Sequence, residues 1–263
     1  LTLTNAKGSQ AALTASASPT NITYNGTTTL STSGGTGTGT VSYAVTAGAS
    51  NCSVVGSTVT GTGVGICTIT ATKASDANYL ETTATVDINV NKANQTSLTA
   101  SASPSTIAFN GTTTLDAIGG SSGGAVSFAV TAGTNFCSVT GNLLTGLDVG
   151  SCTVTATRAG NALYNDVSAQ VVVTVGRALQ TGWAVSGTPS ATVSVNGTVT
   201  LSTSGGSGSG AVSLAITSGA PSCSLSGNVV TGVTPGTCTV TATKAADTQY
   251  ESASATVDIQ VEQ

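Results

Sequence analysis

The chain has 263 residues, of which 39% are hydrophobic, 3% aromatic and only 6% charged, so it has the core material of a folded protein and is not a charged disordered tail. Its net charge of −4, with six basic residues over the whole length, leaves no basic patch for phosphates, and we expect no binding to nucleic acid. No apolar run approaches the roughly 18 residues of a transmembrane helix, so no membrane insertion is expected.

The first six residues alternate apolar and polar side chains, with Leu1 and Leu3 on one face and Thr2 and Thr4 on the other. They align with the strand that closes each copy of an internal repeat. Residues 1–6 therefore predict either the closing strand of a preceding module or an assembly strand. In the second case the strand would pair with a sheet edge of another copy of the chain.

Residues 13–18 and 22–24 predict a first strand broken at Pro19, because proline cannot donate a hydrogen bond inside a sheet and favours a sheet edge. The Asn-Gly-Thr triplet at residues 25–27 predicts a turn, since Asn and Gly both tolerate positive φ. The same triplet also matches a glycosylation acceptor, which stays an alternative interpretation.

A glycine-rich run follows at residues 34–39 and recurs at 119–124 and 205–210. Glycine runs of this kind invite a phosphate-loop interpretation, which requires a helix directly after the run. An alternating strand follows instead in every repeat, so we interpret the runs as flexible loops between strands.

Six cysteines form three pairs with one constant separation, since 67 − 52, 152 − 137 and 238 − 223 are all 15. The repeat symmetry predicts one disulfide inside each repeat, Cys52–Cys67, Cys137–Cys152 and Cys223–Cys238. Metal binding is the rival interpretation, and it lacks a histidine or a second cysteine pair to complete a tetrahedral site. Disulfides in small modules indicate an oxidising compartment, extracellular or at the cell surface.

The repeat length sets the domain organisation. Equivalent cysteines are separated by 137 − 52 = 85 and 223 − 137 = 86 residues, which divides the chain into modules at about 7–91, 92–176 and 177–263. Short strands with frequent turns and no helical period predict an all-β fold of three tandem antiparallel β-sandwich modules.

Four features of the sequence occur together: the hairpin between the two cysteines of a repeat, the run CTITATK with its Asp-x-x-Tyr continuation, the closing strand ATVDINV and a Lys-Ala-x-Gln linker. In this combination they resemble the tandem bacterial immunoglobulin-like repeats of large secreted and surface proteins. The resemblance covers the whole chain and implies an immunoglobulin-like fold for each module. In that fold Tyr79 and Tyr250 would occupy the tyrosine-corner region, which is a structural position. Arg158 and Asn161 depart from the pattern in the second module, and Trp183 replaces a leucine in the third.

Residues able to carry chemistry are sparse. The chain has no histidine, which removes Ser-His and Cys-His catalysis and the usual zinc ligands. The ten acidic residues are scattered singly, so we expect no enzyme activity, no cofactor and no metal site.

Linkers of about five residues are predicted between the modules, at 91–95 and 176–180. Trp183 aligns with Leu13 and Leu98 shortly after each linker. At this position we favour packing between neighbouring modules over stacking of Trp183 on a sugar.

None of the repeats has the long insertion or aromatic cluster that would distinguish a binding module from a spacer. We therefore expect an extracellular structural protein, a rod-like spacer or filament segment of a bacterial surface or secreted assembly, whose partners are neighbouring modules or copies of itself. The alternative is an adhesin module that binds a host, matrix or carbohydrate ligand, and a third, weaker alternative is an appendage of an enzyme.

Overall fold

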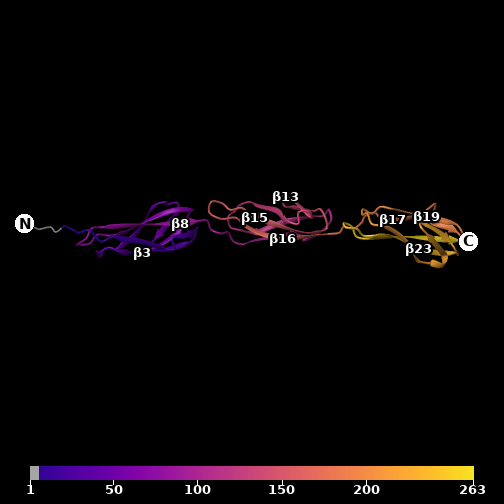
Figure 1. Cartoon of the computed structure of the whole chain (residues 1–263), viewed down its shortest axis with the longest axis horizontal. Helices are drawn as coiled ribbons and strands as arrows, with labels where there is room; N and C mark the ends of the chain where they lie inside the picture. Colours follow the sequence, from indigo (N-terminus) through magenta and orange to yellow (C-terminus); the bar gives the residue numbers. More distant parts are fainter. Residues whose placement is uncertain (1–5) are drawn as a thin grey trace, which may run out of the picture. The chain divides into compact units, whose positions relative to one another are not determined.

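A computed structural model describes residues 6–263, and in this range the chain forms three β-sandwich modules of eight strands each (Figure 1). The one helical turn in this range is the 3-10 helix Ala220–Ser222. The predicted all-β fold of three tandem modules is confirmed.

The strands recur in the same order in every module. The first module contains β1 (Leu13–Ser18), β2 (Asn21–Thr23), β3 (Thr27–Gly34), β4 (Val41–Ala47), β5 (Cys52–Val55), β6 (Thr58–Gly61), β7 (Gly65–Lys73) and β8 (Thr82–Asn91). The second contains β9 (Leu98–Ser103), β10 (Thr106–Ala108), β11 (Thr112–Gly119), β12 (Val126–Ala132), β13 (Cys137–Thr140), β14 (Leu143–Gly146), β15 (Gly150–Arg158) and β16 (Val167–Gly176). The third contains β17 (Ala184–Thr188), β18 (Thr192–Ser194), β19 (Thr198–Ser204), β20 (Val212–Ser218), β21 (Cys223–Ser226), β22 (Val229–Gly232), β23 (Gly236–Lys244) and β24 (Ala253–Glu262).

Each module consists of two four-stranded sheets, which in the first module have the strand orders β1-β3-β6-β5 and β2-β8-β7-β4. Neighbouring strands are antiparallel except β2, which runs parallel to β8 with Ile22 opposite Val90. The exception follows from the break at Pro19, because β1 pairs with β3 in one sheet while β2 crosses to the other. Both parts of the broken first strand lie at sheet edges, as predicted.

The core of each module lies between its two sheets and follows the alternation of the strands. In β7, the side chains of Cys67, Ile69 and Ala71 are fully buried, whereas the intervening threonines are half-buried. Ile69 packs with Ile88 and Leu30 in one hydrophobic cluster. Full burial of an Ile or Val side chain contributes about 1.5–3 kcal/mol, so a small module draws much of its stability from few residues.

The predicted Asn-Gly turns are confirmed. Asn25, Asn110 and Asn196 have φ values of 62°, 61° and 65°, a left-handed conformation that asparagine tolerates. The N–H of Gly26 donates to the carbonyl of Thr23 at 2.7 Å and closes the first turn.

The chain divides into two compact units, and the division passes through the second module. The first unit runs to Thr99 and adds Ala117–Ser127 and Ala156–Ala169. The second unit holds Ala100–Asp116, Phe128–Thr155 and Gln170–Gln263. The first unit thus combines the first module with the glycine-rich loop and the Asn161–Tyr164 loop of the second.

Candidate functional site

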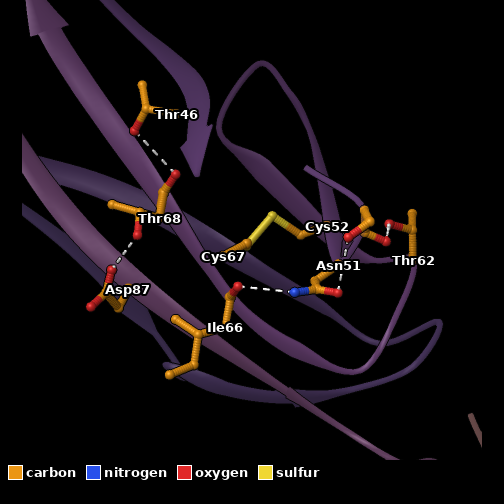
Figure 2. Close-up of a disulfide and its surroundings, with 9 residues drawn as sticks. Thr46, Asn51, Cys52, Thr62, Ile66, Cys67, Thr68 and Asp87 are labelled. Carbon is orange, nitrogen blue, oxygen red and sulfur yellow. Dashed lines mark hydrogen bonds between the residues drawn. A yellow bond between two sulfur atoms is a disulfide. The ribbon is translucent and has the colours of Figure 1, made fainter. Parts of the chain in front are cut away.

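The disulfide of each module joins its two sheets. In the first module, Cys52 opens β5 of one sheet and Cys67 lies in β7 of the other (Figure 2). Their Cα atoms are 6.1 Å apart, and both side chains are buried. The same arrangement recurs with Cα–Cα distances of 6.1 and 6.2 Å, which confirms the predicted pairs Cys137–Cys152 and Cys223–Cys238. No cysteine of the described range remains free for catalysis or metal binding.

Polar contacts fasten the hairpin that carries this disulfide. The side-chain amide of Asn51 donates to the carbonyl of Ile66 at 3.0 Å, and the hydroxyl of Thr62 donates to the carbonyl of Ser50 at 3.2 Å (Figure 2). Gly65 has a φ of 143°, and a Cβ at this position would lie 2.6 Å from the amide nitrogen of Asn51. A glycine is therefore required at the point where β7 begins.

Hydroxyl and carboxylate groups bind one another on the solvent-facing side of the second sheet. The hydroxyl of Thr68 donates to Asp87 at 2.7 Å (Figure 2), and in the third module Thr239 donates to Asp258 at the same distance. Each of these carboxylates lies singly on the surface of its own module. They support cross-strand pairing.

One end of each module is closed by hydrogen bonds to the glycine-rich loop. In the first module we name Gln10, Asp76 and residues 35–38 the glycine-loop cluster. Oε1 of Gln10 accepts the N–H of Gly37 at 3.0 Å, and its Nε2 donates to the carbonyl of Leu80 at 2.8 Å. The predicted loop between two strands is confirmed, and side chains of Gln10 and Asp76 bond to it.

Asp76 is the charged member of this cluster. Its Oδ2 accepts the N–H of Thr38 at 2.6 Å, and its Oδ1 accepts the N–H groups of Asn78 and Tyr79, each at 2.8 Å. These donors, led by the N–H of Thr38, lower the pKa of Asp76 from 3.8 to about 2. In the third module the N–H of Ser209 is the leading cause that lowers the pKa of Asp247 to about 2.

The second module replaces this aspartate by Asn161 and keeps the loop closed by a different bond. Oδ1 of Asn161 accepts the N–H groups of Leu163 and Tyr164 at 2.8 and 3.0 Å, as the aspartate does in the other modules. Its Nδ2 donates to the carbonyl of Ser122 at 2.8 Å, where the aspartates accept a backbone N–H. The bonds made at this position are therefore compatible with a neutral side chain.

In the second module, Gln95 occupies the position of Gln10 and makes more hydrogen bonds than Gln10 does. It is 9% exposed, and its Oε1 accepts the N–H groups of Ser121 and Ser122, both at 3.0 Å. Its Nε2 donates to the carbonyl of Asn165 at 2.8 Å. Sequence reasoning assigned this glutamine no role, although the signal was present: glutamine recurs at 10, 95 and 180, with 95 − 10 = 85 and 180 − 95 = 85.

A basic residue at the end of the same strand contacts the glycine-rich loop in every module. Nζ of Lys73 donates to the carbonyl of Gly35 at 3.3 Å, and Nη1 of Arg158 donates to the carbonyl of Gly124 at 2.9 Å. Nε of Arg158 is buried and has no hydrogen-bond partner among the described residues. The arginine thus makes the same kind of bond to the loop as the lysine, while its own Nε is left without a partner in the described range.

Trp183 contacts residues of its own module. Its indole N–H donates to the carbonyl of Ala242 at 3.0 Å, and Nζ of Lys244 lies 5.5 Å from the ring centroid. Leu13 and Leu98 are each 8% exposed at the start of β1 and β9. Packing between modules by these three residues stays a prediction. The predicted assembly strand Leu1–Thr4 lies outside the described residues.

Two further searches concern the described residues only. Across residues 6–263, His, Cys, Asp and Glu never gather in a group of three or more that could hold a metal ion. In the same range no helix is long and apolar enough to cross a membrane.

No protein-family description matches the chain, and no curated protein matches it either. Solved structures resemble it at low identity. A protocadherin gamma B2 structure of extracellular cadherin domains 1–5 is 13% identical with a TM-score of 0.29, and the alignment covers 92% of this chain and 58% of that one. The surface layer protein SbsC, domains 1–6, is 15% identical with a TM-score of 0.32, covering 98% and 41%. The Escherichia coli adhesin FdeC is 17% identical with a TM-score of 0.28, covering 98% and 100%. We draw no functional conclusion from likeness at this level.

Proposed function

We propose that the chain is an extracellular structural protein whose task is mechanical: a rod-like spacer or filament segment of a bacterial surface or secreted assembly. Its units would be the immunoglobulin-like modules at residues 7–91, 92–176 and 177–263. The disulfides support an oxidising, extracellular location, because intracellular thiols are kept reduced.

The observation that carries the proposal is that every module is held together in two ways. A buried disulfide joins the two sheets, and a glutamine with an Asp or Asn side chain ties the glycine-rich loop at one end. The side chains of the glutamine and of the Asp or Asn at this end of each module are used for these bonds. Such a module resists unfolding under force. Its proposed function therefore depends on the stability of the folded module and not on a reactive side chain.

The alternative, an adhesin module, would need an exposed recognition site. The aromatic ring best suited to stack on a sugar belongs to Trp183, the sole tryptophan. Its indole N–H bonds Ala242 and Lys244 lies over its face, so the residue is already engaged. This arrangement favours the structural role.

Pulling single molecules of the full chain tests the proposal. We expect three discrete unfolding events, one for each module. The gain in length at each event should be smaller than for a reduced module, because the disulfide keeps the chain between its two cysteines, which are 15 residues apart, from extending. Reductant should lengthen each event by about 50 Å, since an extended residue spans about 3.3–3.6 Å. Extension without discrete events, or specific high-affinity binding to matrix glycans by the intact chain, would contradict the mechanical role.

A further inference from the structure

Two aromatic pairs connect residues of successive modules with nearly the same geometry. The rings of Tyr24 and Tyr164 have centroids 5.5 Å apart and an interplanar angle of 83°. The rings of Phe109 and Tyr250 have values of 5.6 Å and 82°. Both members of each pair belong to one compact unit, Tyr24 and Tyr164 to the first, Phe109 and Tyr250 to the second. Edge-to-face packing of this kind is the favoured arrangement of aromatic rings.

The first ring of each pair is anchored where its module ends. Tyr24 directly precedes the Asn-Gly turn, and its N–H donates to the carbonyl of Asn91, the last residue of β8, at 2.8 Å. Phe109 has the same place, and its N–H donates to the carbonyl of Gly176 at 2.8 Å. The turn that follows is held in one conformation by positive φ at its asparagine. The ring is thus presented at a defined position beside the strand that leaves the module.

The second ring of each pair is anchored in the Asp/Asn-x-x-Tyr loop of the next module. The N–H of Tyr164 donates to Asn161 at 3.0 Å, and that of Tyr250 donates to Asp247 at 2.8 Å. Residues around Tyr164 also bind the incoming chain, because the N–H of Ala93 donates to the carbonyl of Leu163 at 2.9 Å and the N–H of Asn165 donates to that of Ala93 at 2.9 Å. This loop is therefore the part of the next module that binds the linker from the preceding module.

The connection between the two anchored regions is a single residue. Asn91 is bonded to the first module and Ala93 to the second, so only Lys92, which is exposed, lies between them. Gly176 and Ala178 are bonded in the same way on either side of Arg177. The linkers are therefore shorter than the five residues predicted from the sequence. A ring contact across one free residue costs little additional chain entropy.

We propose that the Asp/Asn-x-x-Tyr loop is a docking site for the preceding module, and that its partner is an aromatic ring placed immediately before an Asn-Gly turn. The contact couples adjacent modules so that they do not open independently at the joint. Tyr79 has the same loop geometry, since its N–H donates to Asp76 at 2.8 Å and it pairs with Gly8, so it fits the same kind of partner. The third module has Val195 at the equivalent turn position. Because valine has no aromatic ring, it would form a weaker contact with a loop of this kind. This inference deepens the mechanical role, and its failure would leave the fastening within modules untouched.

Amide hydrogen exchange in the full chain tests the coupling. Tyr24→Val introduces the residue found at position 195 and should accelerate exchange of the Ala93 and Asn165 amides by about two- to tenfold, the range expected for loss of one aromatic pair. The amides of Ala178 and Glu251 at the other joint should be unaffected. Phe109→Val should give the reverse pattern. Tyr24→Phe should restore protection, because a phenyl ring occupies the equivalent site at Phe109.

Val195→Tyr is the matched control and should leave both joints unchanged. The variant Tyr164→Leu tests whether Tyr24→Val acts through the ring contact or only through a local loss of stability at Tyr24. If Tyr24→Val acts through the contact, exchange in the double variant Tyr24→Val with Tyr164→Leu should be no faster than in either single variant. Unchanged protection at Ala93 and Asn165 in Tyr24→Val, strictly additive effects in the double variant, or a Tyr24→Phe variant as impaired as Tyr24→Val would each overturn the proposal.

Discussion

The backbone N–H of Thr38 donates a 2.6 Å hydrogen bond to Oδ2 of Asp76 and thereby joins the glycine-rich loop to the Asp-x-x-Tyr loop of the first module. Asp247 makes the same bond to Ser209 in the third module, whereas Asn161 of the second module bonds the carbonyl of Ser122. One position thus carries a titratable group in two modules and a neutral group in the other.

We expect acid to weaken the first and third modules more than the second. The hydrogen bonds lower the pKa of Asp76 and Asp247 from 3.8 to about 2 in the folded chain. A lowered pKa means that the stabilising contribution is complete above the unfolded value of 3.8 and is lost as the pH falls through about 2. Amide exchange resolved by module, followed from about pH 5 down to about pH 2, measures this difference. Asp76→Asn should reduce the acid sensitivity of the first module alone, and an unchanged acid response in this variant would contradict the assignment.

Removal of one disulfide should destabilise one module. Replacing Cys137 and Cys152 by alanine opens a loop closed over a separation of 15 residues. On the chain-entropy estimate the loss is about 3 kcal/mol. Denaturant unfolding with and without reductant provides the measurement and its control, because reductant should weaken the other two modules and leave the altered one as it was. Melting of the wild-type chain that does not respond to reductant would argue against a stabilising role.

Gln95→Met should destabilise the second module by about 2–4 kcal/mol, because the N–H groups of Ser121 and Ser122 and the carbonyl of Asn165 would lose their partner in a buried site. The comparison variant is Gln170→Met, an exposed glutamine with one side-chain bond to Thr155, for which we expect a change within about 0.5 kcal/mol. Thermal unfolding of the two chains decides the point. Equal losses in both variants would mean that Gln95 does not hold the glycine-rich loop.

Deletion of residues 1–6 tests the proposed assembly strand. If Leu1 and Leu3 pair with a sheet edge of another copy, the truncated chain should fail to polymerise while each module melts nearly as before. Sedimentation of full-length and truncated chains over a range of concentrations measures this. Equal assembly of the two chains, or a full-length chain that stays monomeric at high concentration, would rule out this role for the strand.

The sequence by itself determined the modules and their internal framework. Alternation in residues 65–73 predicts which face of that strand is buried, and Cys67, Ile69 and Ala71 are indeed the buried side chains. The constant spacing of 15 between cysteines predicts the disulfides for a similar reason. In both cases the information lies in short-range periodicity and in the repeat, which one chain displays three times.

Only the tertiary structure decided which distant polar and aromatic groups meet. Gln10 and Leu80 are 70 residues apart, so neither the glutamine nor the loop it closes shows by itself what it binds. Tyr24 directly precedes a turn that the sequence predicts, but its contact with Tyr164 depends on the placement of a loop in the following module. The lowered pKa of Asp76 likewise results from backbone N–H groups brought together by folding. Periodicity states whether a side chain faces the core, whereas a hydrogen-bond or ring partner is set by the packing of strands that are remote in the chain.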